Sequence, residues 1–317
     1  MGTKSNPSLM KRGPFSDQNL DLPRLISVTR DAVRKAGQKE LDRYKINARR
    51  AALLLAVQSL GDNATPVAIG QQLLRERHSV SELLSKMEKG GLITEIRDLD
   101  RRNRVRVVLT PKGSEVCRKS IVRESIHKII SSLSRDEINQ LRLLLQRLRD
   151  KTLQELGIER PVPRLPNAKQ DIELYALLIE ATDAIRKARQ KELNEHNIDM
   201  AWSGILLTIG ALGDRATPVA IGQWLLRERH SVSELLSKME KAGLLTKVRD
   251  LERKNRVRVV LTSKGNKVYH QSSTGKIVPR IISSLSKEER QQLKLHLHTL
   301  KNEALKALGK RYPSELV

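Results

Sequence analysis

Cysteine and aromatic residues are scarce in this sequence. Its 317 residues include one cysteine, Cys117, and aromatic side chains make up 2% of the chain. A single cysteine excludes an intrachain disulfide and a metal site built from several thiolates, and it agrees with a reducing cytoplasm. We expect Cys117 to be a buried thiol in a core made of Leu, Ile, Val and Ala.

Long apolar stretches and enzymatic motifs are also missing. No segment approaches the roughly 20 apolar residues that a membrane-spanning helix needs, and the first 15 residues do not resemble a signal peptide. The histidines do not cluster with carboxylates, and no phosphate-binding glycine loop or nucleophile motif occurs. His296 and His298 are expected on an exposed helix face. We therefore predict a cytoplasmic chain that is no enzyme and has no metal, cofactor or membrane partner.

Positive charge is present in large excess. Lys and Arg number 60 against 36 Asp and Glu, a net charge of +24. Such a surface attracts polyanions, and a nucleic acid is the leading candidate because neutralising phosphates releases counterions and strengthens binding.

Nearly the same stretch of sequence occurs twice. Thr65–Thr110 and Thr217–Thr262 are each 46 residues long, align without gaps at an offset of 152, and differ at seven positions. The opening helices of the two copies differ far more. Uniform similarity, as after a recent duplication, does not describe this chain, so the near-identical stretch is expected to have one shared target.

The offset and the composition predict two like domains. We expect a disordered arm at 1–20, domain 1 at 21–157, a proline-containing linker at 158–170, domain 2 at 171–309 and a tail at 310–317. In each domain, apolar periodicity predicts a long opening helix, with Leu25 or Leu174 among its apolar positions, a second helix, a two-helix turn, a hairpin, one helix from about 110 to 132, and a last helix with a Ser134–Glu137 capping box. The second helices are expected at 48–60 and 200–212, capped by Asn47 and Asp199 and ended at Gly61 and Gly213.

The two-helix turn is predicted from its caps and its apolar stripe. Thr65 and Thr217 are expected N-caps, each followed by a proline at the first helical position. The next helix, at about 79–89, has apolar residues at i, i+3, i+4 and i+7, which leaves a polar outer face. Such a helix can enter the major groove. Its candidate recognition residues are Arg77, His78, Ser79, Ser81, Glu82, Ser85, Lys86, Arg229, His230, Ser231, Ser233, Glu234, Ser237 and Lys238.

The hairpin is predicted to form a basic wing. Two β-branched strands at 92–96 and 105–109 flank a charged loop, and arginine at a wing tip suits a minor groove or phosphates. The alternative is a solvated hairpin whose aspartates and arginines pair with each other. The candidate wing residues are Arg97, Asp100, Arg101, Arg102, Arg104, Arg249, Glu252, Arg253, Lys254 and Arg256.

This order of elements resembles the MarR family of winged helix-turn-helix regulators. The residues that carry the resemblance are TPVAIGQQLLRERHSVSELLSKMEKGGLI, RDLDRRNRVRVVLTPKG and SLSRDEINQLRLLLQRL. Asp100-Arg101-Arg102 supplies the wing motif, which becomes Glu252-Arg253-Lys254 in the second copy. The strand follows about one residue later than is usual for the family. The expected fold is mainly α with small β-hairpin wings (α+β), arranged as tandem winged helix-turn-helix domains with a helical dimerisation-type bundle.

The resemblance also implies an assembly and an effector. The family generally pairs two protomers through their first and last helices, so one chain with two protomers is expected to be an internal pseudo-dimer. The alternative is further homodimerisation, in which two chains give four DNA-binding heads. A phenolic-type small molecule is a common effector in the family, and Trp202 and Trp224 are candidates to line its site, with core packing favoured for Trp202.

The predicted function is a sequence-specific double-stranded DNA-binding transcriptional regulator. We expect a repressor that binds a near-palindromic operator as a single-chain pseudo-dimer. The alternatives are an architectural DNA-binding protein with little sequence preference and a protein-interaction adaptor that has lost DNA binding.

Overall fold

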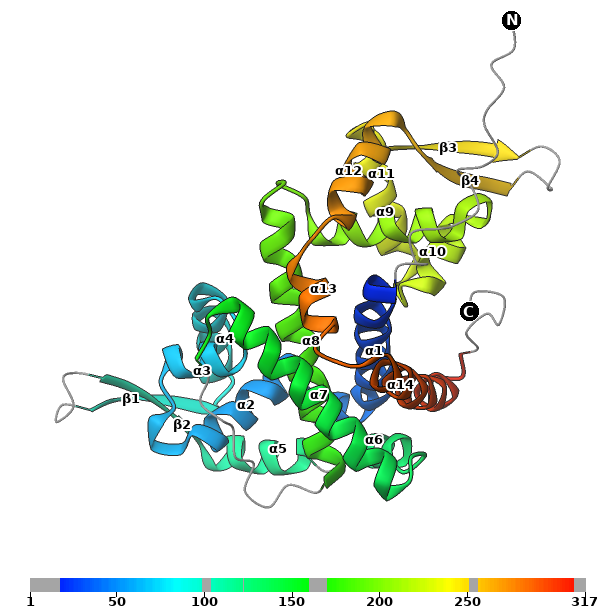
Figure 1. Cartoon of the computed structure of the whole chain (residues 1–317). Coiled ribbons are helices and arrows are strands. Elements are labelled where there is room, and N and C mark those ends of the chain that lie inside the picture. Colours follow the sequence, from blue (N-terminus) through cyan, green and yellow to red (C-terminus); the bar gives the residue numbers. More distant parts are fainter. Residues whose placement is uncertain (1–17, 99–103, 122, 160–169, 251–255, 311–317) are drawn as a thin grey trace, which may run out of the picture. The chain divides into compact units, whose positions relative to one another are not determined.

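The computed structural model describes residues 18–98, 104–121, 123–159, 170–250 and 256–310 (Figure 1). Over these ranges the chain is mainly helical with two antiparallel hairpins, as predicted. The chain forms two compact units, each of which combines segments from both halves of the sequence. The first-head unit consists of Thr29–Lys187 and Lys287–Lys310, and the second-head unit of Met1–Val28, Ala188–Ser286 and Arg311–Val317.

Two long helices contribute residues to both units. They are the opening helices of the two halves, α1 (Gln18–Asp42) and α8 (Gln170–Asn194). Residues 18–20 therefore belong to a helix, whereas the predicted arm included them. The apolar positions of both helices that the sequence predicted as buried, among them Leu25 and Leu174, are buried. Residues 1–17, most of the predicted linker and residues 311–317 lie outside the described residues.

The remaining elements follow the same order in the two halves. In the first half they are α2 (Ala48–Leu60), η3 (Gly61–Asn63), α3 (Pro66–Gln72), α4 (Arg77–Lys89), β1 (Ile93–Asp98), β2 (Arg104–Leu109), α5 (Pro111–Ile121), α6 (Glu124–Ile130) and α7 (Arg135–Leu156). In the second half they are α9 (Met200–Leu212), η5 (Gly213–Arg215), α10 (Pro218–Trp224), α11 (Arg229–Lys241), β3 (Leu245–Asp250), β4 (Arg256–Leu261), α12 (Ser263–Ser273), α13 (Ile277–Ile282) and α14 (Lys287–Ala307).

The helix caps confirm the local signals in the sequence. The Thr65 hydroxyl accepts a hydrogen bond from the Ala68 N–H at 3.1 Å, and Thr217 does the same for Ala220. The proline after each threonine occupies the first turn, where its missing N–H leaves no hydrogen bond unmade. The Ser134–Glu137 capping box is present at the start of α7.

Each unit has an aliphatic core beneath its hairpin. In the first-head unit, residues from α2, α3, α4, both strands and α5 form one buried cluster. Cys117 belongs to this cluster, and its Sγ lies 3.2 Å from Gln58 Oε1. Burial raises the pKa of the Cys117 thiol to about 12. Cys117 is therefore a core thiol, as predicted.

The second core is built with different side chains at two equivalent positions. Tyr269 replaces Cys117, and Gly210 replaces Gln58. A Cβ on Gly210 would lie 2.7 Å from the Tyr269 ring, so the space for this ring depends on the absence of a side chain at position 210. Trp202 packs against the same core, which confirms the packing role favoured for it.

The helix predicted after each hairpin is broken in two. In the second half, α12 ends at Ser273 and α13 starts at Ile277. The buried Glu192 carboxylate from α8 accepts hydrogen bonds from the Ile277 N–H and, at 3.1 Å, the Val278 N–H. In the first half Glu40 accepts from the Ser125 N–H at 2.8 Å. In both halves, therefore, a carboxylate distant in sequence accepts hydrogen bonds at the start of the second of these helices. No local sequence signal indicates that the helix breaks there.

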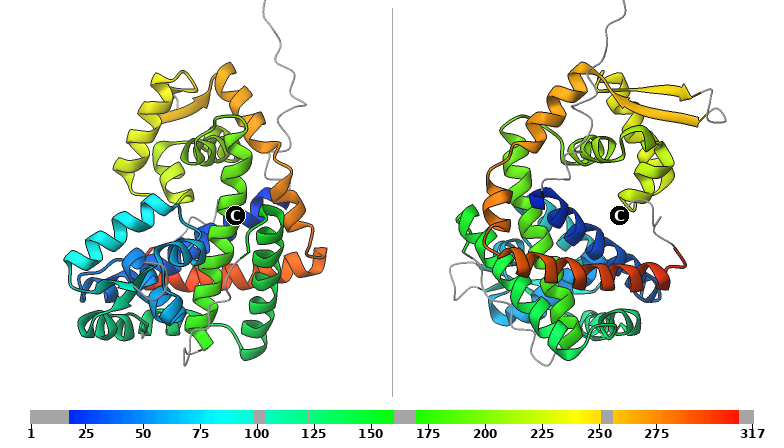
Figure 2. Two further views of the ribbon diagram at one scale, coloured as in Figure 1. Left: turned by 90° about the vertical axis from the view of Figure 1, so that its left-hand side faces the viewer. Right: turned by 45° about the vertical axis from the view of Figure 1, so that its right-hand side comes forward.

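The position predicted for His296 was also wrong. His296 is 6% exposed, and its Nε2 lies 2.9 Å from Gln140 Oε1 on α7. Burial lowers the pKa of His296, and the Glu137 carboxylate opposes that shift. His296 is buried because its helix, α14, packs against α7 (Figure 2).

Helices from both halves pack together in the first-head unit. Gln140 Nε2 on α7 donates to Gln292 Oε1 on α14 at 2.8 Å, and these two residues are equivalent at the offset of 152. On α8, Glu180 accepts from the α7 guanidinium of Arg149 at 3.0 Å. No helix of the described ranges is long and apolar enough to span a lipid bilayer.

Candidate nucleic-acid interface

The turn between α3 and α4 is held in a compact form in both heads. The Arg75 N–H donates to the Gly70 carbonyl at 2.9 Å, and a Cβ on Gly70 would lie 3.3 Å from the Arg75 carbonyl oxygen. Leu74 has φ of 51°, in the left-handed region that non-glycine residues seldom adopt. Gly222, Leu226 and Arg227 repeat this geometry. The angle between the two helices is therefore fixed locally.

The recognition helix buries one stripe and exposes the other side. Val80, Leu84 and Met87 on α4 are buried in the core, as are their equivalents on α11. The seven candidate residues of α4 are all exposed, and on α11 only Ser231 is half-buried. The structure thus gathers each set of predicted recognition residues on one accessible face.

The start of each recognition helix differs from the prediction. α4 begins at Arg77, two residues earlier than expected, and its N-cap residue is Glu76; α11 and Glu228 match them. No serine therefore occupies the cap position. Instead, Ser81 Oγ donates within the helix to the Arg77 carbonyl at 3.1 Å. The serines lie along the exposed face, where a hydroxyl can contact a phosphate or a base edge.

Ion pairs order the charged residues on these faces. Lys86 donates to Glu82 one turn earlier on α4, and Lys238 Nζ donates to Glu234 Oε1 on α11 at 2.7 Å. The hydrogen bond from the lysine lowers the pKa of each glutamate. Because exposed pairs of this kind are weak, either lysine can exchange its glutamate for a DNA phosphate.

The hairpin strands are longer than predicted, and the loop is correspondingly shorter. β1 runs to Asp98 and β2 starts at Arg104, with these two residues in register. Arg97 therefore lies in a strand, where it is exposed, and Arg249 does so in the second head. Asp100, Arg101, Arg102, Glu252, Arg253 and Lys254 lie outside the described residues, so their wing role stays a prediction.

Two contacts that the sequence did not indicate fasten each hairpin. Arg106 on β2 pairs with Asp62 of η3, and Arg258 pairs with Asp214. The Val107 N–H also donates to the Ala64 carbonyl at 2.7 Å. The only trace of the ion pair in the sequence is that an aspartate and an arginine occur 44 residues apart in both copies, which does not by itself indicate a contact.

The glycine after the second strand has a steric role. A Cβ on Gly113 would lie 1.8 Å from the Leu92 carbonyl oxygen, and one on Gly265 would lie 1.8 Å from that of Leu244. The Thr110 hydroxyl donates to the Gly91 carbonyl at 2.7 Å and accepts from the Gly113 N–H at 2.9 Å. The Leu-Thr-x-x-Gly motif therefore docks α5 against the base of the hairpin.

Comparison with known proteins agrees with this geometry. Residues 205–265, which run from α9 through the hairpin to Gly265, match the family model described as a winged helix DNA-binding domain. The chain contains a winged helix DNA-binding domain. The equivalent winged helix region of the first half is nearly identical between Thr65 and Thr110.

Two solved structures are similar to part of the chain. They are the ligand-free and 2,4-dichlorophenol-bound forms of an organohalide-sensing transcriptional regulator, RdhR-CbdbA1625. Each aligns at 27% identity over 45% of this chain and 85% of its own, with a TM-score of 0.39. No curated protein matches the chain significantly. The phenolic-type effector of the present chain stays a prediction.

Proposed function

We propose that this chain is a transcriptional regulator that binds a near-palindromic DNA operator through both winged helix heads. The observation that carries the proposal is the pair of exposed recognition faces with identical candidate residues on α4 and α11. Identical faces bind the same base pattern, and two copies of one pattern make a palindrome or a direct repeat. Repression would follow from occlusion of a promoter, and the chain would act in the cytoplasm.

The packing of the helices favours an internal pseudo-dimer. Gln140 and Gln292 are equivalent residues in contact with each other, as expected near a local two-fold axis. A two-fold arrangement of two heads corresponds to a palindrome rather than to a direct repeat. A single chain would then replace the homodimer that the resemblance implies.

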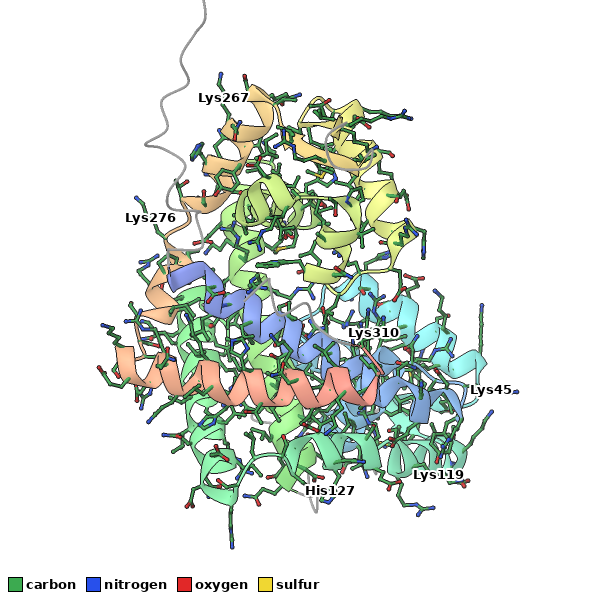
Figure 3. All side chains as sticks on the ribbon, turned by 90° about the vertical axis from the view of Figure 1, so that its right-hand side faces the viewer. Lys45, Lys119, His127, Lys267, Lys276 and Lys310 are labelled. Atoms are coloured by element: carbon green, nitrogen blue, oxygen red, sulfur yellow. The ribbon has the colours of Figure 1, made fainter. Side chains whose placement is uncertain are left out.

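The test begins with selection of bound DNA from a random pool, followed by mobility shifts at several salt concentrations. Arg77→Ala with Arg229→Ala should lower affinity for the selected site by about tenfold or more, because each guanidinium can contact a base edge or a phosphate. Arg101→Ala with Arg253→Ala is a second variant, which tests the contribution of the predicted wings to DNA affinity. The control is Lys45→Ala with Lys276→Ala, two exposed lysines outside the recognition helices and wings (Figure 3).

Each alternative function has its own outcome. An architectural protein would bind random and selected duplexes equally and lose both as salt rises. An adaptor would show no useful DNA binding at any salt concentration. If the control variant lost as much affinity as the Arg77/Arg229 variant, charge rather than recognition would explain binding, and sequence-specific recognition would be rejected.

A further inference from the structure

One arginine joins equivalent aspartates from the two halves of the chain. Arg30 Nη1 lies 2.9 Å from Asp31 Oδ1, and Arg30 Nη2 lies 3.0 Å from Asp183 Oδ1. Asp183 is the offset equivalent of Asp31. The position equivalent to Arg30 is Thr182, which is 2% exposed. The first half alone therefore supplies the cation at this point.

The same one-sided pattern recurs between α7 and α14. Arg147 Nη1 lies 2.6 Å from Glu289 Oε1. The equivalent positions hold Thr299 and Glu137, so a carboxylate is present in both halves but an arginine in only one. Arg149 also pairs with Glu180 at 3.0 Å, but its offset equivalent is the buried Lys301, so here both halves carry a cation and the difference lies in the carboxylate. The equivalent of Glu180 is Val28, so a second copy of the first half has no carboxylate there.

Other charges close to these carboxylates do not remove the asymmetry. Arg34 Nε lies 3.7 Å from Asp31 Oδ1 on the same helix, and its offset equivalent in the second half, three residues after Asp183, is also an arginine, Arg186. Asp183 also interacts electrostatically with Arg75, in the turn before the recognition helix. Contacts of the opposite polarity also occur. Lys187 of the second half lies 3.7 Å from the exposed Glu76, and His296 Nδ1 of the second half lies 3.9 Å from Glu137 Oε1. At the Arg30 and Arg147 positions the cation nevertheless comes from the first half alone, and at the third pair the Glu180 carboxylate comes from the second half alone.

We infer that the two halves are complementary rather than interchangeable, and that the pairing surface of each accepts the other half and not its own copy. This inference rests on the proposed internal pseudo-dimer. Two second halves would bring threonine against Asp183 and Glu289 in place of both arginines. Two first halves would force a second Arg30 into the buried space of Thr182 and place Val28 where Arg149 needs a carboxylate. Paired surfaces exclude wrong partners through mismatches of charge and volume of this kind.

The consequence is a fixed stoichiometry. Exchange of halves between two chains would still join unlike halves, but pairing of like with like would carry the mismatches described above. A chain whose own second half lies within reach at high effective concentration has no reason to exchange. One chain should therefore occupy one operator.

The decisive experiment moves the arginines to the other half of the full-length chain. Arg30→Thr with Arg147→Thr removes both cations and should raise the unfolding equilibrium constant about tenfold or more, because partly buried carboxylates lose their partners. Adding Thr182→Arg and Thr299→Arg regenerates the pairs in mirror arrangement, with Asp31 and Glu137 as the new acceptors. Most of the lost stability should return in chemical denaturation. No return would mean that Arg30 and Arg147 act only as local packing, and the inference would be overturned.

A second set of variants covers the case in which the buried site does not tolerate exchange. Arg147 has a half-exposed side chain, so Arg147→Thr and the exchange Arg147→Thr with Thr299→Arg should both fold. The exchange should be more stable than the single variant. The matched control is Lys151→Thr, which removes a cation paired with Glu155 within α7. Thr299→Arg should not restore the stability that Lys151→Thr removes. If Thr299→Arg raised the free energy of unfolding equally in the Arg147→Thr and Lys151→Thr backgrounds, the inference would be contradicted.

The mass of the wild-type chain separates this inference from the proposed function. If the wild-type chain has a mass near 35.9 kDa at nanomolar concentration but the arginine exchange restores no stability, the complementarity of the halves is rejected and the single-chain pseudo-dimer stands. A mass twice as large would reject the single-chain pseudo-dimer itself.

Discussion

At the scale of single residues, Gly113 and Gly265 show how one missing side chain sets the position of a wing. Replacing either with alanine pushes a Cβ into the carbonyl oxygen of Leu92 or Leu244, and both partners are backbone atoms held by neighbouring secondary structure. Neither can move as a flexible side chain could. The helix and the hairpin have to separate instead.

We therefore expect Gly113→Ala to lower the free energy of unfolding by about 1–3 kcal/mol or more, as overpacking does. Thermal and denaturant unfolding would measure it. Gly204→Ala is the matched control, because that glycine lies within α9 and a Cβ added there would meet nothing within 4 Å beyond the backbone of its own helix. The control should be neutral or stabilising by up to about 1 kcal/mol. An equal loss in both variants would show that the Leu92 contact is unimportant.

Cys117 should be chemically silent in the folded chain. It is fully buried, and with a pKa of about 12 the thiolate is roughly one part in ten thousand at pH 8. A disulfide reagent such as DTNB should therefore label it only as fast as the core opens. Because it is the one cysteine, the absorbance change reports this site alone. Rapid labelling of the folded protein, in excess of its unfolding rate, would contradict the assigned burial.

Local residue signals were the most predictable part of the structure. Thr65 and Asn47 cap their helices as expected because a cap depends only on neighbours within a few positions. Glu192 could not be found in this way, since it meets the Ile277 N–H across 85 positions. His296 was misplaced for the same reason. Its burial depends on Gln140 of another helix, which no periodicity within α14 reveals.

At the scale of elements, the two heads differ in charge at the base of the hairpin. In the first head the Glu95 backbone N–H donates to Glu88 Oε1 at 3.2 Å, and the Glu95 side chain adds a second negative charge to this part of the hairpin. In the second head Lys247 Nζ donates to Glu240 Oε2 at 2.7 Å, and that hydrogen bond lowers the pKa of Glu240. The second hairpin base is therefore locally neutral where the first is negative.

We expect the second head to attract phosphates more strongly. Glu95→Lys should raise DNA affinity at low salt, and Lys247→Glu should lower it, with the salt dependence steepening or flattening by up to about one counterion. Fluorescence anisotropy over a salt series would measure both. Opposite changes of similar size support the electrostatic explanation. If neither variant altered the salt slope, the hairpin base would lie outside the reach of DNA.

Element boundaries were predicted well where a capping residue or a glycine marks the end of a helix, and poorly elsewhere. α2 and α9 have the predicted bounds because Asn47 or Asp199 precedes them and Gly61 or Gly213 follows. The strands extend further than predicted because the backbones of Asp98 and Arg104 continue the antiparallel register, and the sequence carries no signal for where that pairing ends. The exposed side of α4 was predicted correctly because amphipathic spacing alone decides which side is buried, and the recognition role of its residues stays a prediction.

At the scale of the whole molecule, the division into units does not follow the sequence repeat. α1 and α8 each contribute residues to both units, so two continuous helices run from one unit into the other. The repeat could be read from the sequence, but the exchange of helices could not. It depends on contacts such as Arg30 with Asp183, which are 153 positions apart.

This connection predicts that DNA affinity depends on the spacing of the two half-sites. Inserting roughly 5 bp between the selected half-sites turns one of them to the opposite face of the duplex. We expect two heads that share continuous helices to follow that rotation poorly, so affinity should fall by roughly 100-fold as the second contact is lost. Duplexes with insertions ranging from none to about one helical turn, titrated at one salt concentration, would give the profile. A duplex with a single half-site supplies the reference, because the worst spacing should bind no better than it does. Affinity that was the same at every spacing would mean that the heads act as independent binders on a flexible tether.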